Sequence, residues 1–102
     1  MTEKSQIARS NDEFRANILN PKLNMGKRIV LSFGFNLLPD RDIENILQAI
    51  AKFDNFNEDN DPWGEHDFGV IATDWHEVFW TIATLDTKQA SRVLTVMLAE
   101  EY

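Results

Sequence analysis

The chain has 102 residues, 17 acidic and 10 basic, with a formal net charge of −7 and no cysteine. Disulfides and thiolate metal sites are therefore excluded. A hydrophobic content of 43% supplies one core and excludes disorder of the whole chain. This length suits one domain and is too short for two. We expect a single domain over residues 1–102, with disorder allowed at residues 1–5.

The N-terminal residues are polar and contain no apolar stretch of the kind found in signal peptides. No run of the chain approaches the ~20 apolar residues that a membrane span needs. A cytoplasmic location is expected.

Most of the negative charge lies in Asp54–Asp67, which holds six acids and no Lys or Arg, whereas the remainder holds 11 acids against 10 bases. Such a field repels phosphate backbones, so direct binding of nucleic acid through this face is disfavoured. A cation or a basic protein surface is its natural complement. The plainer alternative is a solvated loop whose acids serve solubility only.

The N-terminal segment from about residue 2 to residue 19 predicts a short amphipathic helix, with Ile7, Phe14 and Ile18 as its apolar positions. Ser10 and Glu13 fit a capping box, which leaves open whether the helix begins there or earlier. Asn20-Pro21 ends it, because the residue before proline avoids helical angles.

After a polar connection at Lys22–Gly26, the run Arg28–Gly34 predicts a strand buried on both faces. A second helix begins near Pro39 and Asp40. Its apolar residues recur at spacings of three and four, which predicts packing on a sheet; they are Ile43, Ile46, Leu47, Ile50 and Phe53.

Residues Phe68–Thr73 and Glu77–Leu85 predict a β-hairpin, with a turn at residues 74–76 that lacks the glycine of tight hairpins. The last segment, Arg92–Tyr102, fits a helix or a strand. We predict a strand paired with Glu77–Leu85 across the loop Asp86–Ser91, because a third strand gives the hairpin the minimum for an independently stable sheet.

These elements define an α+β fold. We expect a small antiparallel sheet of three to four strands packed by two helices, in the order α-β-α-β-β-β.

The acidic segment carries the chemistry that the sequence offers. Its oxygen-rich side chains could hold a hard divalent cation. The candidate ligands are Asp59, Asp61, Glu65, His66 and Asp67. The calcium-loop pattern nevertheless fails, because Trp63 and Val70 stand where ligands belong. Zinc is no better supported, since His66 and His76 are ten residues apart and outside any predicted helix.

Two other interpretations of this segment stay open. His66 between Glu65 and Asp67 could act as a general base. Alternatively, the Asp and Asn side chains bond to nearby backbone N–H groups and simply hold an irregular loop together. Trp63 and Trp75 lie in predicted loops, where tryptophan either covers the core or anchors an interface.

Three segments resemble an uncharacterised family of short bacterial proteins. They are Asn57–Gly69, with the run EDNDPWGEHDFG, then Val78-Phe79-Trp80, and Arg92–Tyr102, with the run RVLTVMLAEEY. Gly26–Leu38 also fits the family, so the resemblance covers residues 10–102. The family is known only as a domain of unknown function, and many members are encoded on plasmids and other mobile elements.

The resemblance implies no activity but suggests a setting. A mobile-element protein would serve plasmid or phage upkeep, control of gene expression, or inhibition of host defence. Relatives tend to carry an Asp and tyrosines where this chain has Thr81–Leu85, so a catalytic scheme based on those side chains is not carried over.

We therefore predict a non-enzymatic, acidic protein-binding module, and its sharpest form is an inhibitor of host defence encoded on a mobile element. Its partner would be a basic protein surface, such as that of a nucleic-acid-binding complex, and its binding residues are Glu58, Asp59, Asp61, Trp63 and Glu65. No cofactor is required by this prediction. The alternative is a small metal-dependent hydrolase that uses the acidic loop at residues 58–67 and a divalent cation.

Overall fold

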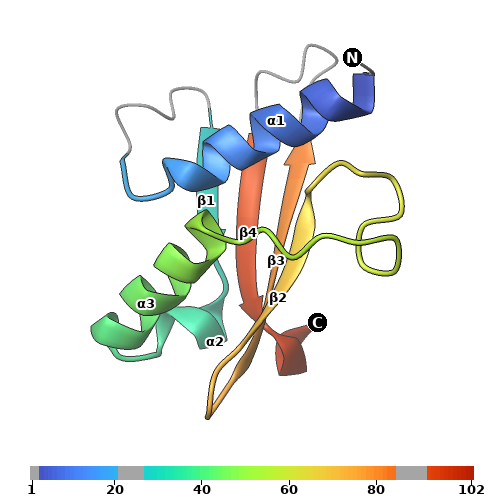
Figure 1. Ribbon diagram of the computed structural model, residues 1–102. Coiled ribbons are helices and arrows are strands. Elements are labelled where there is room, and N and C mark those ends of the chain that lie inside the picture. Colours follow the sequence, from blue (N-terminus) through green and yellow to red (C-terminus); the bar gives the residue numbers. More distant parts are fainter. Residues whose placement is uncertain (1–2, 21–26, 85–91) are drawn as a thin grey trace.

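A computed structural model describes residues 3–20, 27–84 and 92–102. The chain has the α+β fold that the sequence predicts (Figure 1). The elements, in order, are α1 (Glu3–Ala16), β1 (Lys27–Leu31), α2 (Phe33–Asn36), α3 (Asp40–Ala51), β2 (Phe68–Ala72), β3 (Glu77–Thr84), β4 (Arg92–Leu98) and the 3₁₀ helix η2 (Ala99–Glu101). The predicted connections at Lys22–Gly26 and Asp86–Ser91 lie outside the described residues.

The four strands form one sheet in the order β1-β4-β3-β2. The hairpin β2–β3 and the pair β3–β4 are antiparallel, as expected, but β1 pairs with β4 in parallel. The sheet is therefore mixed rather than wholly antiparallel. The difference arises because β1 and β4 are far apart in the chain, and no local pattern encodes the relative direction of such strands.

β1 is an edge strand, and the prediction that it is buried on both faces is wrong. Arg28, Ile29 and Val30 are exposed, and within the described residues β1 has β4 alone beside it. The strand also ends earlier than predicted. Ser32 accepts a hydrogen bond from the backbone N–H of Phe35 at 3.2 Å, and this N-cap begins α2 at Phe33.

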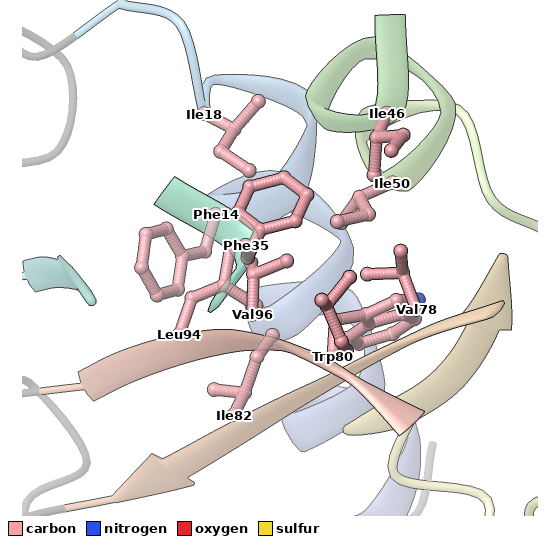
Figure 2. Close-up of a cluster of buried hydrophobic side chains, with 11 residues drawn as sticks. Phe14, Ile18, Phe35, Ile46, Ile50, Val78, Trp80, Ile82, Leu94 and Val96 are labelled. Atoms are coloured by element: carbon pink, nitrogen blue, oxygen red, sulfur yellow. The ribbon is translucent and has the colours of Figure 1, made fainter. Parts of the chain in front are cut away.

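Helices α1 and α3 lie on the same face of the sheet, and the core lies between these helices and the sheet (Figures 1 and 2). Alternate residues of β3 and β4 point into it, as the two-residue period of strands requires. Figure 2 shows Trp80 beside Val78, on the side of this layer where Ile50 of α3 lies. The fully buried apolar side chains are Phe14, Phe35, Ile50, Val78, Trp80, Leu94 and Val96.

The second predicted helix is confirmed as α3, with Ile46 and Ile50 buried. The first helix, α1, begins at Glu3, so Ser10 and Glu13 lie inside it and do not form its cap. Among the described residues, no helix has the length and apolar character needed to cross a membrane.

The last segment is a strand, as predicted, up to Leu98, and a 3₁₀ turn follows at Ala99–Glu101. The Glu101 carboxylate accepts hydrogen bonds from the Ser32 hydroxyl at 2.5 Å and from the backbone N–H groups of Leu98 and Gly34 at 2.9 Å each. These bonds, the Ser32 hydroxyl foremost, hold the pKa of Glu101 below its ordinary value. They join the end of the chain to the start of α2.

Gly69 is required by the close approach of β2 to the indole of Trp80. A Cβ atom at this position would lie 2.5 Å from Nε1 of Trp80. The backbone of β2 can therefore pass over the ring only without a side chain.

We predict that Gly69→Ala lowers the free energy of unfolding by about 1–3 kcal/mol, the usual cost of overpacking a core. Chemical denaturation measures the loss. Gly64→Ala is the contrasting variant, because a Cβ there meets no atom within 4 Å and only its φ of +65° is unfavourable. A Gly69→Ala protein as stable as the wild type would contradict this account of the core.

Candidate functional site

The acidic loop, residues 54–67, connects α3 to β2, crosses the helix-covered face of the sheet and projects beyond β2 (Figure 1). Its tip is held by its own amide side chains. The side chain of Asn57 accepts hydrogen bonds from the backbone N–H groups of Asp59 and Asn60 at 2.8 and 3.1 Å. In return, the side chain of Asn60 accepts one from the N–H of Asn57 at 2.8 Å. The tip therefore has a defined shape without secondary structure.

Asp61 turns inward and fixes the second half of the loop. Its carboxylate accepts hydrogen bonds from the backbone N–H groups of Glu65 and His66 at 3.1 and 3.3 Å, and only 6% of its side chain is exposed. Gly64 and His66 both have positive φ, 65° and 55°. A compact turn of this kind uses glycine where it can, and His66 holds its unusual backbone angle through side-chain contacts.

His66 joins the loop to α1. Its Nδ1 donates to the Asp12 carboxylate at 2.9 Å, its Nε2 lies 3.7 Å from Oδ2 of Asp61, and its ring stacks on Phe56 with centroids 3.9 Å apart. Beside it, the side-chain amide of Asn11 donates to the backbone oxygen of Glu65 at 2.9 Å. Two residues of α1 thus hold the base of the loop.

Arg15 extends these contacts into the core. Only 1% of this residue is exposed. Nη1 donates to the carbonyl oxygens of Ile50 and Phe53 at 3.1 and 2.8 Å, and Nη2 donates to the Asp12 carboxylate. The guanidinium lies 4.9 Å from the ring centroid of Trp80. Burial lowers the pKa of Arg15, and the charge and hydrogen bond of Asp12 act in the opposite direction.

The contribution of α1 to this site is not predicted from the sequence. Asn11, Asp12 and Arg15 have the composition of a solvated helix face, yet Asn11 and Arg15 are buried. The one available signal is the spacing of three between Asp12 and Arg15, which allows an ion pair on a helix. That spacing is common on exposed helices and does not point to the loop.

The predicted site residues fall into two groups. Glu58, Asp59 and Trp63 are exposed, Trp63 to 66%. Asp61, Glu65, His66 and Asp67 are partly buried and lie in the half of the loop that faces the protein. A hollow of about 410 Å³ lies between the two groups, with Glu58, Trp63 and His66 in its lining.

The candidate metal ligands do not converge. Among the described residues, which include the whole acidic loop, no three His, Asp or Glu side chains are placed to hold one ion. Asp61 is occupied with backbone N–H groups and His66 with Asp12. The geometry thus gives the metal-dependent hydrolase no support.

Asp67 lies where the loop enters β2, and its backbone oxygen accepts a hydrogen bond from the N–H of Ile82 at 2.8 Å. Burial raises the pKa of Asp67 above its ordinary value, and the charge of Asp61 raises this pKa further. A backbone hydrogen bond and His66 act in the opposite direction. Burial is the largest of these effects, so the folded state disfavours the ionised carboxylate.

Fold and loop together define a small α+β domain with a hydrogen-bonded acidic loop beside an edge strand. The family model for proteins of unknown function designated DUF3768 matches residues 31–101, and the chain therefore belongs to this family. The expected membership of an uncharacterised family is confirmed. Searches of curated proteins and of solved structures returned no match.

We predict that Asp12→Ala lowers the free energy of unfolding by about 1–3 kcal/mol, because it leaves the buried Arg15 and the His66 ring without their shared acceptor. A thermal or chemical melt measures the loss. Glu13→Ala is the matched control on the exposed side of α1, where a change within about 0.5 kcal/mol is expected. Equal melts for the two variants would show that the contact between α1 and the loop is not stabilising.

A second prediction concerns pH. Because the pKa of Asp67 is raised in the folded state, its ionisation costs stability as the pH rises above the ordinary value of 3.8. Asp67→Asn removes that cost. We expect the variant to melt at a higher temperature than the wild type at pH 7 and at the same temperature at pH 3. Asp59→Asn, at an exposed position, serves as the control, and a lower melting temperature for Asp67→Asn at pH 7 would contradict the assignment.

Proposed function

We propose that the chain is a non-enzymatic binding module that engages a basic surface of a nucleic-acid-handling protein through the acidic loop. The observation that carries the proposal is the combination of exposed acids and an exposed tryptophan on a loop of fixed shape. Glu58 and Asp59 are exposed beside Trp63, and the backbone beneath them is held by Asn57 and Asn60.

The fixed shape bears on affinity. Binding costs free energy when a flexible loop must be ordered, and a loop already held in one conformation avoids most of that cost. In this loop the side chains of Asn57, Asn60 and Asp61 make the ordering bonds within the free protein. The exposed residues can therefore meet a partner without rearrangement of the backbone.

The chemistry of the exposed residues sets the kind of partner. Carboxylates attract Lys and Arg and raise association rates, while the indole of Trp63 supplies apolar area and a surface on which a cation can pack. Asp61 and Glu65, predicted as contact residues, would contribute mainly by shaping the loop and adding to its field. A partner that normally binds phosphate has the matching charge.

A setting on mobile elements, which the family resemblance implies, supports a sharper form of the proposal. In that form the chain is a cytoplasmic inhibitor that presents carboxylates where a host-defence protein would bind nucleic acid. The acids would stand in for phosphates, so inhibitor and nucleic acid would compete for one surface.

We predict that the double variant Glu58→Lys/Asp59→Lys binds its partner protein more weakly than the wild type. A protein captured from a bacterial host lysate by the wild type should bind this variant at least about tenfold more weakly, because two attractive contacts become repulsive. Binding of the wild type should also weaken as the salt concentration rises. Titration calorimetry with the captured protein gives both quantities.

The matched control is Glu13→Lys/Glu44→Lys, which changes the net charge equally at exposed positions on the helices. Both double variants should melt near the wild-type temperature, since exposed substitutions rarely change stability by more than about 0.5 kcal/mol. If the loop variant binds as tightly as the helix variant, the acidic loop is not the contact surface.

A further inference from the structure

The free edge of β2 is the feature that the proposed function leaves unused. β2 is the terminal strand of the sheet and has only β3 beside it within residues 3–20, 27–84 and 92–102. An edge strand presents backbone N–H and C=O groups that can pair with another strand. The open side of β2 can therefore accept another strand. The residues on and around β2 determine which kind of strand it binds.

The hydrogen-bond register identifies which groups are free. The backbone N–H of Ile82 donates to the carbonyl oxygen of Asp67, and the N–H of Thr73 donates to the carbonyl oxygen of His76. Asp67 and Ile82 therefore form one hydrogen-bonded pair of the β2–β3 ladder, and Thr73 and His76 form another. Bonded and non-bonded pairs alternate along an antiparallel ladder, so Gly69 and Ile71 are also bonded to β3. The N–H and C=O groups of Phe68, Val70 and Ala72 consequently point away from β3.

Nothing in the composition of β2 protects this edge. Natural edge strands usually carry a charged residue, a proline or a bulge that prevents pairing with other chains. β2 reads Phe-Gly-Val-Ile-Ala, with no charge and no proline, and its pairing with β3 is regular over all five residues. Val70 and Ala72 are exposed, and because side chains alternate along a strand they point to the face opposite the Trp80 ring that Gly69 meets.

Acidic groups flank the strand at both ends. The acidic loop with Trp63 precedes β2, and a hollow of about 180 Å³ follows it, lined in part by Asp42, Asp74 and Trp75. Residues 53–87 contain nine acids and no Lys or Arg, whereas the rest of the chain holds eight acids and ten bases. The field along this edge therefore favours a cationic partner.

The hollow after β2 has a fixed wall. The hydroxyl of Thr73 accepts hydrogen bonds from the backbone N–H groups of Trp75 and His76 at 3.3 and 2.9 Å, which holds the hairpin turn in one shape. Trp75 is 86% exposed on this turn. An aromatic face next to two carboxylates suits the ammonium or guanidinium of a Lys or Arg side chain.

We propose that the edge of β2 binds an extended, basic segment of a partner protein, which adds to the sheet as a fifth strand. Its backbone pairs with Phe68, Val70 and Ala72, and Lys or Arg side chains near its two ends contact the acidic loop and the Trp75 hollow. The five residues of β2 span about 17 Å, so a segment of seven to nine residues reaches both. This inference rests on the proposed function, because it assigns the conformation of the basic partner.

A second copy of this chain is the competing occupant, and charge disfavours it. Antiparallel pairing of two β2 strands brings the acidic loop of one copy against the Trp75 turn of the other, where Asp42 and Asp74 lie. Parallel pairing brings like ends together. Either arrangement places acids against acids, which costs free energy.

The test uses the 102-residue chain and a blocked nine-residue peptide of alternating lysine and valine. A glutamate–valine peptide of the same length is the charge control. Amide hydrogen exchange is followed by NMR. We expect the lysine peptide, but not the glutamate peptide, to slow the exchange of the Phe68, Val70 and Ala72 amides by at least about tenfold. Unchanged exchange at these amides overturns the proposal.

Val70→Pro provides the matched variant. The Val70 N–H points outward, so proline removes a docking donor without removing a bond to β3, and edge positions tolerate it. We expect at least a tenfold loss of affinity for the lysine peptide relative to Val70→Thr, which keeps the N–H. Equal affinities overturn the proposal. If Val70→Pro does not fold, the exchange of the wild-type amides decides alone.

Two further outcomes separate the occupants and the proposals. If the edge amides of the protein alone are protected, and this protection increases with protein concentration, the edge binds a second copy and the proposal is overturned. Peptide binding that protects the edge equally in wild type and in Glu58→Lys/Asp59→Lys contradicts the proposed role of the loop acids only. Loss of a captured partner on charge reversal, with the edge amides unprotected by the lysine peptide, contradicts the docking strand only.

Discussion

The guanidinium of Arg15 lies where α1, α3, the acidic loop and the sheet meet. It donates to two carbonyl oxygens at the end of α3, pairs with Asp12, and packs near the rings of Phe56 and Trp80. Removing such a charge from water is costly unless its donors are paired. Nη1 and Nη2 of Arg15 have hydrogen-bond acceptors, whereas its buried Nε has none. Arginine suits the position because its planar fork bonds several acceptors while its faces pack on aromatic rings.

Asp12 carries this arrangement outward to the loop. Its Oδ1 faces both Arg15 and His66, so one carboxylate joins the core cation to the base of the acidic loop. The position of the loop relative to the sheet thus depends on a chain of contacts that begins in the core. This dependence explains how a loop without secondary structure can keep exposed side chains in fixed places.

The parts of the structure that the sequence predicts are those with a local pattern. Ile46 and Ile50 recur with the helical period, and Val78, Trp80 and Ile82 alternate with the period of a strand, so α3 and β3 follow from spacing. The strand at Arg92–Leu98 follows from its β-branched residues and from the need of the hairpin for a third strand.

The parts that the sequence does not predict depend on distant contacts. The parallel pairing of β1 joins Lys27 to Arg92, and no residue near either one encodes it. Arg15 and Asn11 are polar residues on a helix, and their burial follows from what packs above them. Asp61 shows the same limit in the acidic loop, since its carboxylate could equally serve a metal or the backbone, and only the fold of the loop selects the backbone.

The position of β4 has a consequence for the synthesis of the chain. β4 lies between β1 and β3, yet it follows both of these strands in the chain. Until the ribosome has made it, β1 has no strand beside it and β2–β3 is a lone hairpin, which is marginally stable in water. Translation that stops early therefore removes the middle of the sheet, together with Leu94 and Val96, rather than an edge.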